Sequence, residues 1–305
     1  MKITALAGGV GGAKLLVGLD RATAGALTAI VNTGDDATIY GVHVSPDVDI
    51  VSYWLAELAD VERGWGIKGD TFRVVDALGR LGGESWFRLG DRDFATCVQR
   101  TQLLASGVTL SAATDQITRM LGVRPRVLPM SDDIVRTKVV CSDGRTLEFQ
   151  EYFVKERHRP AVAEVRFDGI AEAKPSPEVI ESIEEADAVI VCPSNPVVSI
   201  GPILGLPGVR DALRGHERVI AVSPIVRGAP LKGPADRLLP ALGAEVSASG
   251  VAGLYADFCN VFVVDETDNE QLEPVEELGV EGAALDTIMT DHDASERLAT
   301  RLLTL

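Results

Sequence analysis

Cysteine, aromatic residues and long apolar runs are all scarce in this sequence of 305 residues. The four cysteines (Cys97, Cys141, Cys192 and Cys259) are far apart, and none belongs to a C-x-x-C pair. This spacing argues against a disulfide framework or a zinc site, so we expect buried free thiols in a reducing compartment. The sequence shows no signal peptide and no apolar run of transmembrane length, which predicts a cytoplasmic protein with no membrane partner.

Positive charge is scarce as well. The sequence has 29 Lys and Arg residues but 45 Asp and Glu residues, which gives a net charge of −16. A general nucleic-acid surface depends on Lys and Arg to displace counterions, so we expect no nucleic-acid partner. An anionic ligand would need a local positive site made by loops, by a few basic side chains or by a metal. The length allows one large α/β domain or two smaller ones.

Short apolar runs alternate with segments of helical period, which predicts an α/β fold with a parallel-sheet core and helices on both faces. The clearest predicted strands are residues 3–7, 27–32, 188–192, 218–222 and 261–264. We expect a single domain over residues 1–305, with a smaller helical insertion or lid at 51–135 that contains helices near 51–59, 94–104 and 114–121. A β-hairpin is predicted at 137–154. Polar turns follow the strands, so a composite ligand site is expected at the carboxyl edge of the sheet.

A glycine-rich turn joins the first predicted strand to a helix and contains Gly8, Gly9, Gly11 and Gly12. Glycine allows a ligand close to the backbone N–H groups, and a helix that begins there points its positive dipole end at the same place. The turn therefore predicts a phosphate site. Lys14 stands where the dinucleotide fingerprint has its third glycine, and the ending typical of a P-loop is missing. A turn that binds no ligand is the plainer alternative.

Four carboxylates follow the second predicted strand: Asp35, Asp36, Asp47 and Asp49. They would repel a phosphate unless a cation lay between them, and Mg²⁺ binds one or two carboxylates together with phosphate oxygens. One acid could instead bind a ribose hydroxyl. In the alternative without a ligand, Asp35 caps a helix and the other acids are solvated turn residues.

Residues 86–93 combine two arginines, two acids and two aromatic rings. Arg88 and Arg92 suit a phosphate, and the aromatic faces suit a planar ring. The alternative is a salt-bridged turn in which Asp91 or Asp93 caps the helix at 94–104.

Small polar residues follow the later predicted strands and could read a base or a sugar. No Ser-His-Asp or Cys-His set is visible, and the four histidines are interpreted as surface residues. The candidates in these later loops are Ser194, Asn195, Ser199, Ser223 and Ile225.

Seven segments stand in an order that resembles one known family, the 2-phospho-L-lactate transferases of coenzyme F-420 biosynthesis (CofD/FbiA type). They are residues 8–14, 32–36, 46–49, 89–93, 130–133, 193–196 and 223–225. The resemblance implies a Rossmann-like α/β core with a smaller helical part, usually in a homodimer. It also implies transfer of a phospholactyl or phosphoenolpyruvyl group from a guanosine diphosphate ester to the terminal ribityl hydroxyl of the deazaflavin Fo. GMP leaves, and Mg²⁺ is required.

The resemblance implies roles for the residues above. Gly9, Gly11, Gly12 and Lys14 would hold the donor diphosphate. Asp35, Asp47 and Asp49 would bind Mg²⁺, orient the hydroxyl or act as base, in a division that the sequence leaves open. The other predicted substrate-binding residues are Asp36, Arg88, Asp91, Arg92, Ser194, Asn195, Ser199, Ser223 and Ile225.

Two other functions stay open at this stage. One is a non-catalytic CofD-like regulator that binds a nucleotide sugar, which Fo binding would distinguish from a transferase. The other is an NAD(P)-dependent dehydrogenase, which Lys14 and the surplus of acids disfavour. The choice between phospholactate and phosphoenolpyruvate is also open, because these groups differ by only two hydrogens.

Overall fold

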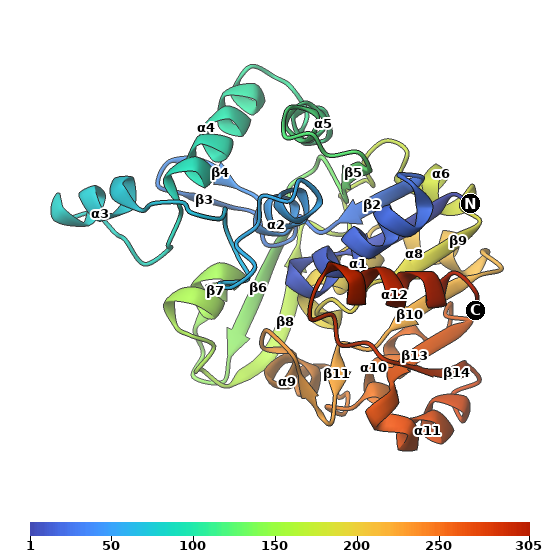
Figure 1. The fold of residues 1–305 in the computed structure, drawn as a ribbon. Helices are drawn as coiled ribbons and strands as arrows, with labels where there is room; N and C mark the ends of the chain where they lie inside the picture. The colour runs from blue at the N-terminus through green and yellow to red at the C-terminus, as the bar shows by residue number, and fades with distance from the viewer.

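A seven-stranded parallel sheet forms the centre of the computed structural model, which describes residues 1–305 (Figure 1). Its strands, in order across the sheet, are β14 (Glu281–Leu285), β13 (Val261–Asp265), β10 (Val219–Val222), β9 (Ala188–Val191), β1 (Ile3–Ala7), β2 (Leu27–Val31) and β5 (Arg126–Pro129). The central strands are buried along their whole length, as expected for a parallel sheet that is covered on both faces. The predicted α/β fold is therefore confirmed, and the five predicted strands agree with the observed strands to within one residue at either end.

Two apolar cores lie on opposite faces of this sheet. On one face, α1 (Gly9–Thr23) lies beside α12 (His292–Leu302) and α2 (Pro46–Leu55). The helices of the other face are α6 (Val179–Glu184), α7 (Gly201–Gly205), α8 (Val209–Arg214), α9 (Ala235–Leu238), α10 (Ala248–Tyr255) and α11 (Leu272–Glu276). None of the helices combines the length and apolar composition needed to cross a bilayer.

The chain between β2 and β5 carries most of the helical insertion. It contains the hairpin of β3 (Ala37–Ile39) and β4 (Val42–Val44), then α2, α3 (Arg73–Arg80), α4 (Asp91–Ala105) and α5 (Leu110–Met120). In Figure 1, α3 and α4 project away from the central sheet. Two boundaries differ from the prediction: α2 begins at Pro46 rather than at 51, and β5 lies within the predicted insertion although it pairs with β2 in the core.

A second, three-stranded antiparallel sheet follows β5. Its strands are β6 (Arg136–Cys141), β7 (Thr146–Glu148) and β8 (Val162–Asp168), in the order β7-β6-β8. The predicted hairpin is confirmed as β6 and β7, whereas β8 was not predicted. The short hairpin of β11 (Ile225–Val226) and β12 (Ala229–Pro230), two π-helical turns at Glu151–Lys155 and Pro196–Ile200, and two 3₁₀ turns at Leu239–Leu242 and Glu266–Gln271 complete the fold. All four cysteines are buried and free, as the sequence predicts.

Candidate active site

The site is built around the first turn of α1, directly after β1. The backbone N–H of Gly9 donates to Asp47 Oδ1 at 2.7 Å, and the N–H of Gly8 donates to Ser194 Oγ at 3.1 Å. Gly9 has a φ of +63°, a left-handed conformation that favours glycine. The remaining N–H groups of this first turn have no acceptor within the helix. The turn therefore joins the acid at the start of α2 to the loop that follows β9.

Three of the glycines in this turn are also required by packing. A Cβ on Gly8 would collide with Asp47, one on Gly11 would collide with the carbonyl of Pro193, and one on Gly12 would lie 2.5 Å from Ser194 Oγ. A Cβ on Gly9 would make only an ordinary contact, 3.9 Å from Asp47 Oδ1, so its positive φ rather than packing favours glycine there. The glycine pattern thus has a structural cause in addition to the ligand-binding cause that the sequence suggested.

Asn32 connects two of the predicted carboxylates. Its Nδ2 lies 3.1 Å from Asp35 Oδ1 and 2.9 Å from Asp47 Oδ2, and its Oδ1 accepts from the N–H of Gly34. Gln150, which follows β7, donates to the second oxygen of Asp35 at 2.7 Å. The structure therefore brings Asp35 and Asp47 together at the carboxyl ends of β1 and β2. Neither Asn32 nor Gln150 was predicted as a site residue, and Gln150 offers no sequence signal because it is 115 residues from Asp35.

Asp36 faces a different set of partners from those of Asp35. His43 Nε2 lies 2.8 Å from Asp36 Oδ2, and the hydroxyl of Ser45 donates to Asp36 Oδ1 at 2.6 Å. The interpretation of His43 as a surface residue is wrong, because its side chain is half-buried against Asp36. The β3–β4 hairpin brings them together: Asp36 precedes β3 and His43 lies in β4.

Burial perturbs both carboxylates that Asn32 connects. Burial, followed by repulsion from Asp47 and Asp36, holds the pKa of Asp35 well above its usual range. Burial also raises the pKa of Asp47 to about 6, against hydrogen bonds from Asn32, Gly9 and Ser199 that lower it. Neither carboxylate has an ion-pair partner among the salt bridges of the chain. We call Asp35, Asp36 and Asp47 the acidic centre.

Asp49 does not join this centre, which corrects the prediction that it shares one site with Asp35 and Asp47. It accepts two hydrogen bonds from Arg100 of α4, one of them from Nη1 at 3.1 Å. Both side chains are buried, and Arg100 is 1% exposed. The residues at positions 47 and 49 point to different sides because both lie in the first turns of α2, where two residues correspond to roughly 200° of rotation.

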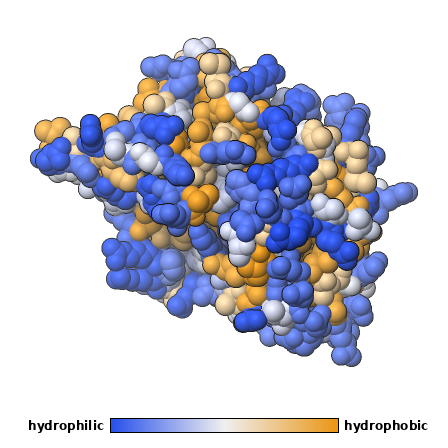
Figure 2. Space-filling view, in the orientation of Figure 1, coloured by the Kyte–Doolittle hydropathy of each residue, from blue (hydrophilic) through white to orange (hydrophobic).

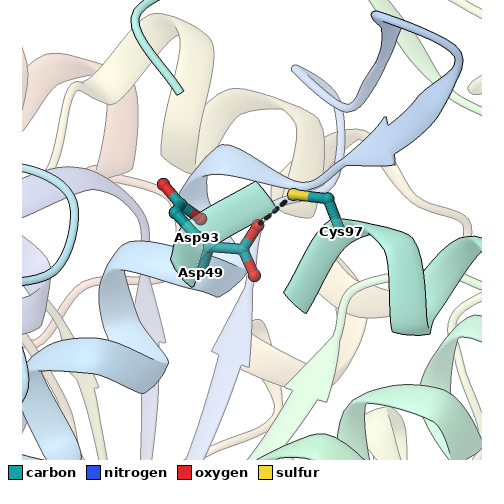
Figure 3. A group of neighbouring side chains, drawn as sticks. All are labelled: Asp49, Asp93 and Cys97. Atoms are coloured by element: carbon teal, nitrogen blue, oxygen red, sulfur yellow. Dashed lines mark hydrogen bonds between the residues drawn. The ribbon is translucent and has the colours of Figure 1, made fainter. Parts of the chain in front are cut away.

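A second buried polar cluster surrounds Asp49 (Figure 3). Ligand atoms of Asp49, Asp93 and Cys97 lie within 4.8 Å of one another, and the hydroxyl of Tyr53 donates to Asp93 at 2.7 Å. Burial and the neighbouring Asp49 raise the pKa of Asp93 to about 7. Arg100 already supplies a positive charge here, so the cluster is explained as a buried ion pair that attaches α4 to α2.

The segment 86–93 has structural partners within the insertion. Arg88 pairs with Asp76 at 2.7 Å, and the backbone N–H of Arg92 donates to Asp70. Asp91 accepts from the N–H groups of Arg73 and Val74. Asp91 therefore caps α3. The hydrogen bond from the Thr71 hydroxyl, followed by those from Val74 and Arg73, lowers the pKa of Asp91. Of the alternative without a ligand, the salt-bridged turn is observed, but its cap is not: Asp91 and Asp93 lie within α4, whose N-cap residue is Gly90.

The loops after β9 and β10 lie at the same sheet edge as the glycine turn. Asn195 Oδ1 accepts from the N–H groups of Val197 and Val198, and its buried Nδ2 has no partner. Ser199 is buried beside Gly8. Ser223 exchanges hydrogen bonds with the backbone of Ile225, so these two residues stabilise their own loop.

Lys14 points away from the glycine turn. Its ammonium donates to the carbonyl of Met289 at 2.7 Å and lies 5.8 Å from the ring centre of Trp54. The predicted residues thus divide among three places: the acidic centre with the glycine turn, the insertion, and the segment that precedes α12.

A parallel sheet with a glycine turn and buried carboxylates at its carboxyl edge defines a Rossmann-like α/β protein. The family model described as 2-phospho-L-lactate transferase CofD matches residues 3–303, and the chain belongs to this family. It is a CofD-type transferase.

Similar proteins cover the whole chain. A 2-phospho-L-lactate transferase of Methanosarcina mazei is 41% identical over 293 residues, which is 96% of each chain. A phosphoenolpyruvate transferase of Streptomyces griseus is 44% identical over 312 residues, covering 100% of this chain and 98% of its own. The crystal structure of protein BH3568 from Bacillus halodurans superposes with a TM-score of 0.66 at 17% identity, over 99% of both chains, and supports the fold alone.

Proposed function

We propose that this protein transfers a 2-phospholactyl or phosphoenolpyruvyl group from a guanosine diphosphate ester to the terminal ribityl hydroxyl of the deazaflavin Fo. The products are GMP and coenzyme F-420-0 or its dehydro form. Relatives with names of both kinds, 2-phospho-L-lactate transferase and phosphoenolpyruvate transferase, match nearly the entire chain. The homodimer and the cytoplasmic location remain predictions.

The acidic centre is the observation that carries this proposal. Asp35 and Asp47 are buried, share the amide of Asn32 and have no cationic side chain as partner. The first turn of α1, with its N–H groups, lies directly beside them. This arrangement favours ligands of both charges. The carboxylates favour a cation, and the helix terminus favours an anion. A metal-bound diphosphate meets both needs together.

The donor set of the acidic centre fits Mg²⁺. Asp35 and Asp47 offer hard carboxylate oxygens, which Mg²⁺ prefers together with phosphate oxygens and water. Asp49 is less suited to this role because the Arg100 guanidinium already neutralises its charge, whereas the hydrogen-bond donors to Asp35 and Asp47 are neutral. We therefore assign Asp35 and Asp47 to the metal. When bound, Mg²⁺ would neutralise charge on the diphosphate and orient it.

The reaction needs no covalent enzyme intermediate. Its rate depends mainly on how the protein positions the two substrates. The ribityl oxygen attacks the distal phosphorus, the bond from this phosphorus to the bridging oxygen breaks, and GMP takes that oxygen with its electron pair. The hydroxyl proton passes to a carboxylate oxygen of the acidic centre. The N–H groups of the glycine turn would hold the diphosphate oxygens in line. Asn195 Nδ2, which is buried without a partner, would donate a hydrogen bond to an acceptor atom of the nucleotide.

One assay tests the transfer directly. Purified protein is incubated with Fo and each of the two guanosine diphosphate esters, with Mg²⁺ or with a chelator, and the products are measured by mass spectrometry. We expect GMP and a phosphodiester of Fo with one ester at least, and no product with the chelator. Absence of product with both esters, together with no binding of Fo, would instead favour the nucleotide-sugar-binding alternative.

A further inference from the structure

The second sheet supplies a buried side chain to the acidic centre. Gln150 follows β7 and is the N-cap residue of the π-helical turn Glu151–Lys155, and its Nε2 donates to Asp35 Oδ2 at 2.7 Å. The second sheet lies at the lower left in Figure 1, and mostly blue, hydrophilic side chains cover this part of the surface in Figure 2. Gln150 differs from these surface residues, because it is only 6% exposed.

Apolar side chains on both sides of Gln150 fix its position. Phe149 is buried and stacks on Phe153, with ring centres 5.6 Å apart, and Tyr152 is fully buried. Phe149 and Tyr152 belong to the apolar core on one face of the central sheet. A buried amide is unfavourable unless it has a hydrogen-bond partner, and the carboxylate of Asp35 provides one. The turn therefore holds the amide of Gln150 against Asp35.

A second contact attaches the same sheet to the loop that carries Asp35. The backbone N–H of Thr137, in β6, donates to the carbonyl of Gly34 at 2.6 Å. A Cβ on Gly34 would lie 2.9 Å from Thr137 Oγ1, so the loop and the strand approach each other closely. The second sheet thus holds two consecutive residues of the loop, Gly34 through its backbone and Asp35 through its side chain.

The two oxygens of Asp35 have different donors. Oδ1 accepts from Nδ2 of Asn32 at 3.1 Å, and Oδ2 accepts from Nε2 of Gln150. Donors on both oxygens fix the plane of the carboxylate. Both donors are neutral amides, so the negative charge of an ionised Asp35 is not cancelled, and each oxygen keeps a lone pair for a cation. Hydrogen bonds of this kind orient a carboxylate that binds a metal.

We propose that Gln150 is a positioning residue that orients the carboxylate of Asp35 for the metal of the acidic centre. This inference rests on the proposed function, which assigns Asp35 to Mg²⁺. Gln150 acts through Asp35, because its amide N–H donates to the carboxylate. The second sheet is then part of the active site, although it lies outside the parallel sheet that carries the glycine turn.

Binding of Mn²⁺ to the whole chain tests this role without turnover. Mn²⁺ prefers the same oxygen ligands as Mg²⁺, and electron paramagnetic resonance of the free ion measures its affinity. Gln150→Met keeps the length of the side chain but removes the donor, and we expect it to weaken Mn²⁺ binding by about 10- to 100-fold. Gln150→Asn keeps the amide but is one methylene too short, so it should weaken binding similarly. Gln116→Met is the matched control, because Gln116 is exposed on α5, and it should leave Mn²⁺ affinity unchanged.

The dependence of the transfer rate on Mg²⁺ gives a second measurement. In both Gln150 variants, the Mg²⁺ concentration for the half-maximal rate should rise by the same factor as the Mn²⁺ dissociation constant. The rate at saturating Mg²⁺ should fall by less than about 3-fold, because the variants weaken metal binding rather than the chemical step. A merely structural role would lower the thermal unfolding temperature and leave the Mg²⁺ dependence unchanged.

Unchanged Mn²⁺ affinity in folded Gln150→Met would overturn the role of Gln150, even if Gln150→Asn binds more weakly, because packing rather than a hydrogen bond would then explain the loss. If Gln150→Met does not fold, the Mn²⁺ affinity of Gln150→Asn decides. Failure of the proposed function has a different signature. A parent protein that binds no Mn²⁺ contradicts both proposals, whereas one that binds Mn²⁺ but forms no product from Fo contradicts the transfer alone.

Discussion

Replacing Asp49 by asparagine tests whether this residue is a partner of Arg100 or a member of the acidic centre. Asparagine keeps the shape of the side chain but removes the charge that faces the buried guanidinium. Arginine stays protonated in proteins, so its charge would remain buried without a counter-ion. Loss of one partner of a buried ion pair costs about 3–5 kcal/mol. We expect Asp49→Asn to lower the free energy of unfolding by about this amount.

Urea denaturation followed by circular dichroism measures the effect, with a double-mutant cycle to isolate the pair. Arg100→Gln should be destabilising as well, and the double variant should lose at least about 2 kcal/mol less than the sum of the two single losses. Asp115→Asn is the control, because it removes an exposed pair with Arg119 and should change stability by less than about 1 kcal/mol. If Asp49→Asn keeps the stability of the parent and loses only turnover, our assignment of Asp49 is wrong.

Three further predictions concern other parts of the structure. Asp47→Asn should lower turnover by at least about 100-fold, with urea stability at pH 8 equal to or above that of the parent, because a buried charge is removed. Gly11→Ala should lower the free energy of unfolding by about 1–3 kcal/mol because its Cβ meets the carbonyl of Pro193, whereas the helical control Gly253→Ala, which has room, should not. Burial raises the pKa of Asp93 to about 7, so this acid stays protonated in the folded state while the unfolded chain loses its proton near pH 4. Its contribution to stability should therefore fall by up to about 1.4 kcal/mol per pH unit as pH rises towards 7. Urea midpoints of Asp93→Asn should show a shallower decline than those of the parent, because Asp35 and Asp47, whose pKa values are also raised, still contribute.

The sequence predicted the strands whose apolar runs are uninterrupted and missed those that are mixed. β1, β9, β10 and β13 are buried along their length, and each reads as a short apolar run. β14 is only half-buried, with the small-residue sequence EGAAL, and β5 is a four-residue strand that ends in proline. Both lie at the edges of the sheet, where a strand needs fewer apolar residues. Short edge strands are therefore difficult to predict from the pattern of apolar residues.

The acidic cluster was predicted as a group, but its internal division depends on where α2 begins. A helix that starts at residue 51 leaves Asp47 and Asp49 together in a turn, free to converge on one ion. Proline at the first helical position is a common start signal, and Pro46 occupies that position here. A helix that begins at Pro46 separates the two acids onto different sides. The partner of Asp49 is Arg100 of α4, which lies 51 residues further along the chain. No local sequence pattern predicts this pairing.

The glycine turn and Lys14 belong to the same helix but have different partners. The first turn of α1 contacts Asp47 through the N–H of Gly9, whereas the ammonium of Lys14 donates to the carbonyl of Met289. In a chain of net charge −16, a nucleotide is repelled by most of the surface, so a local site must supply the attraction. The N–H groups at the start of α1 can supply it without the side chain of Lys14.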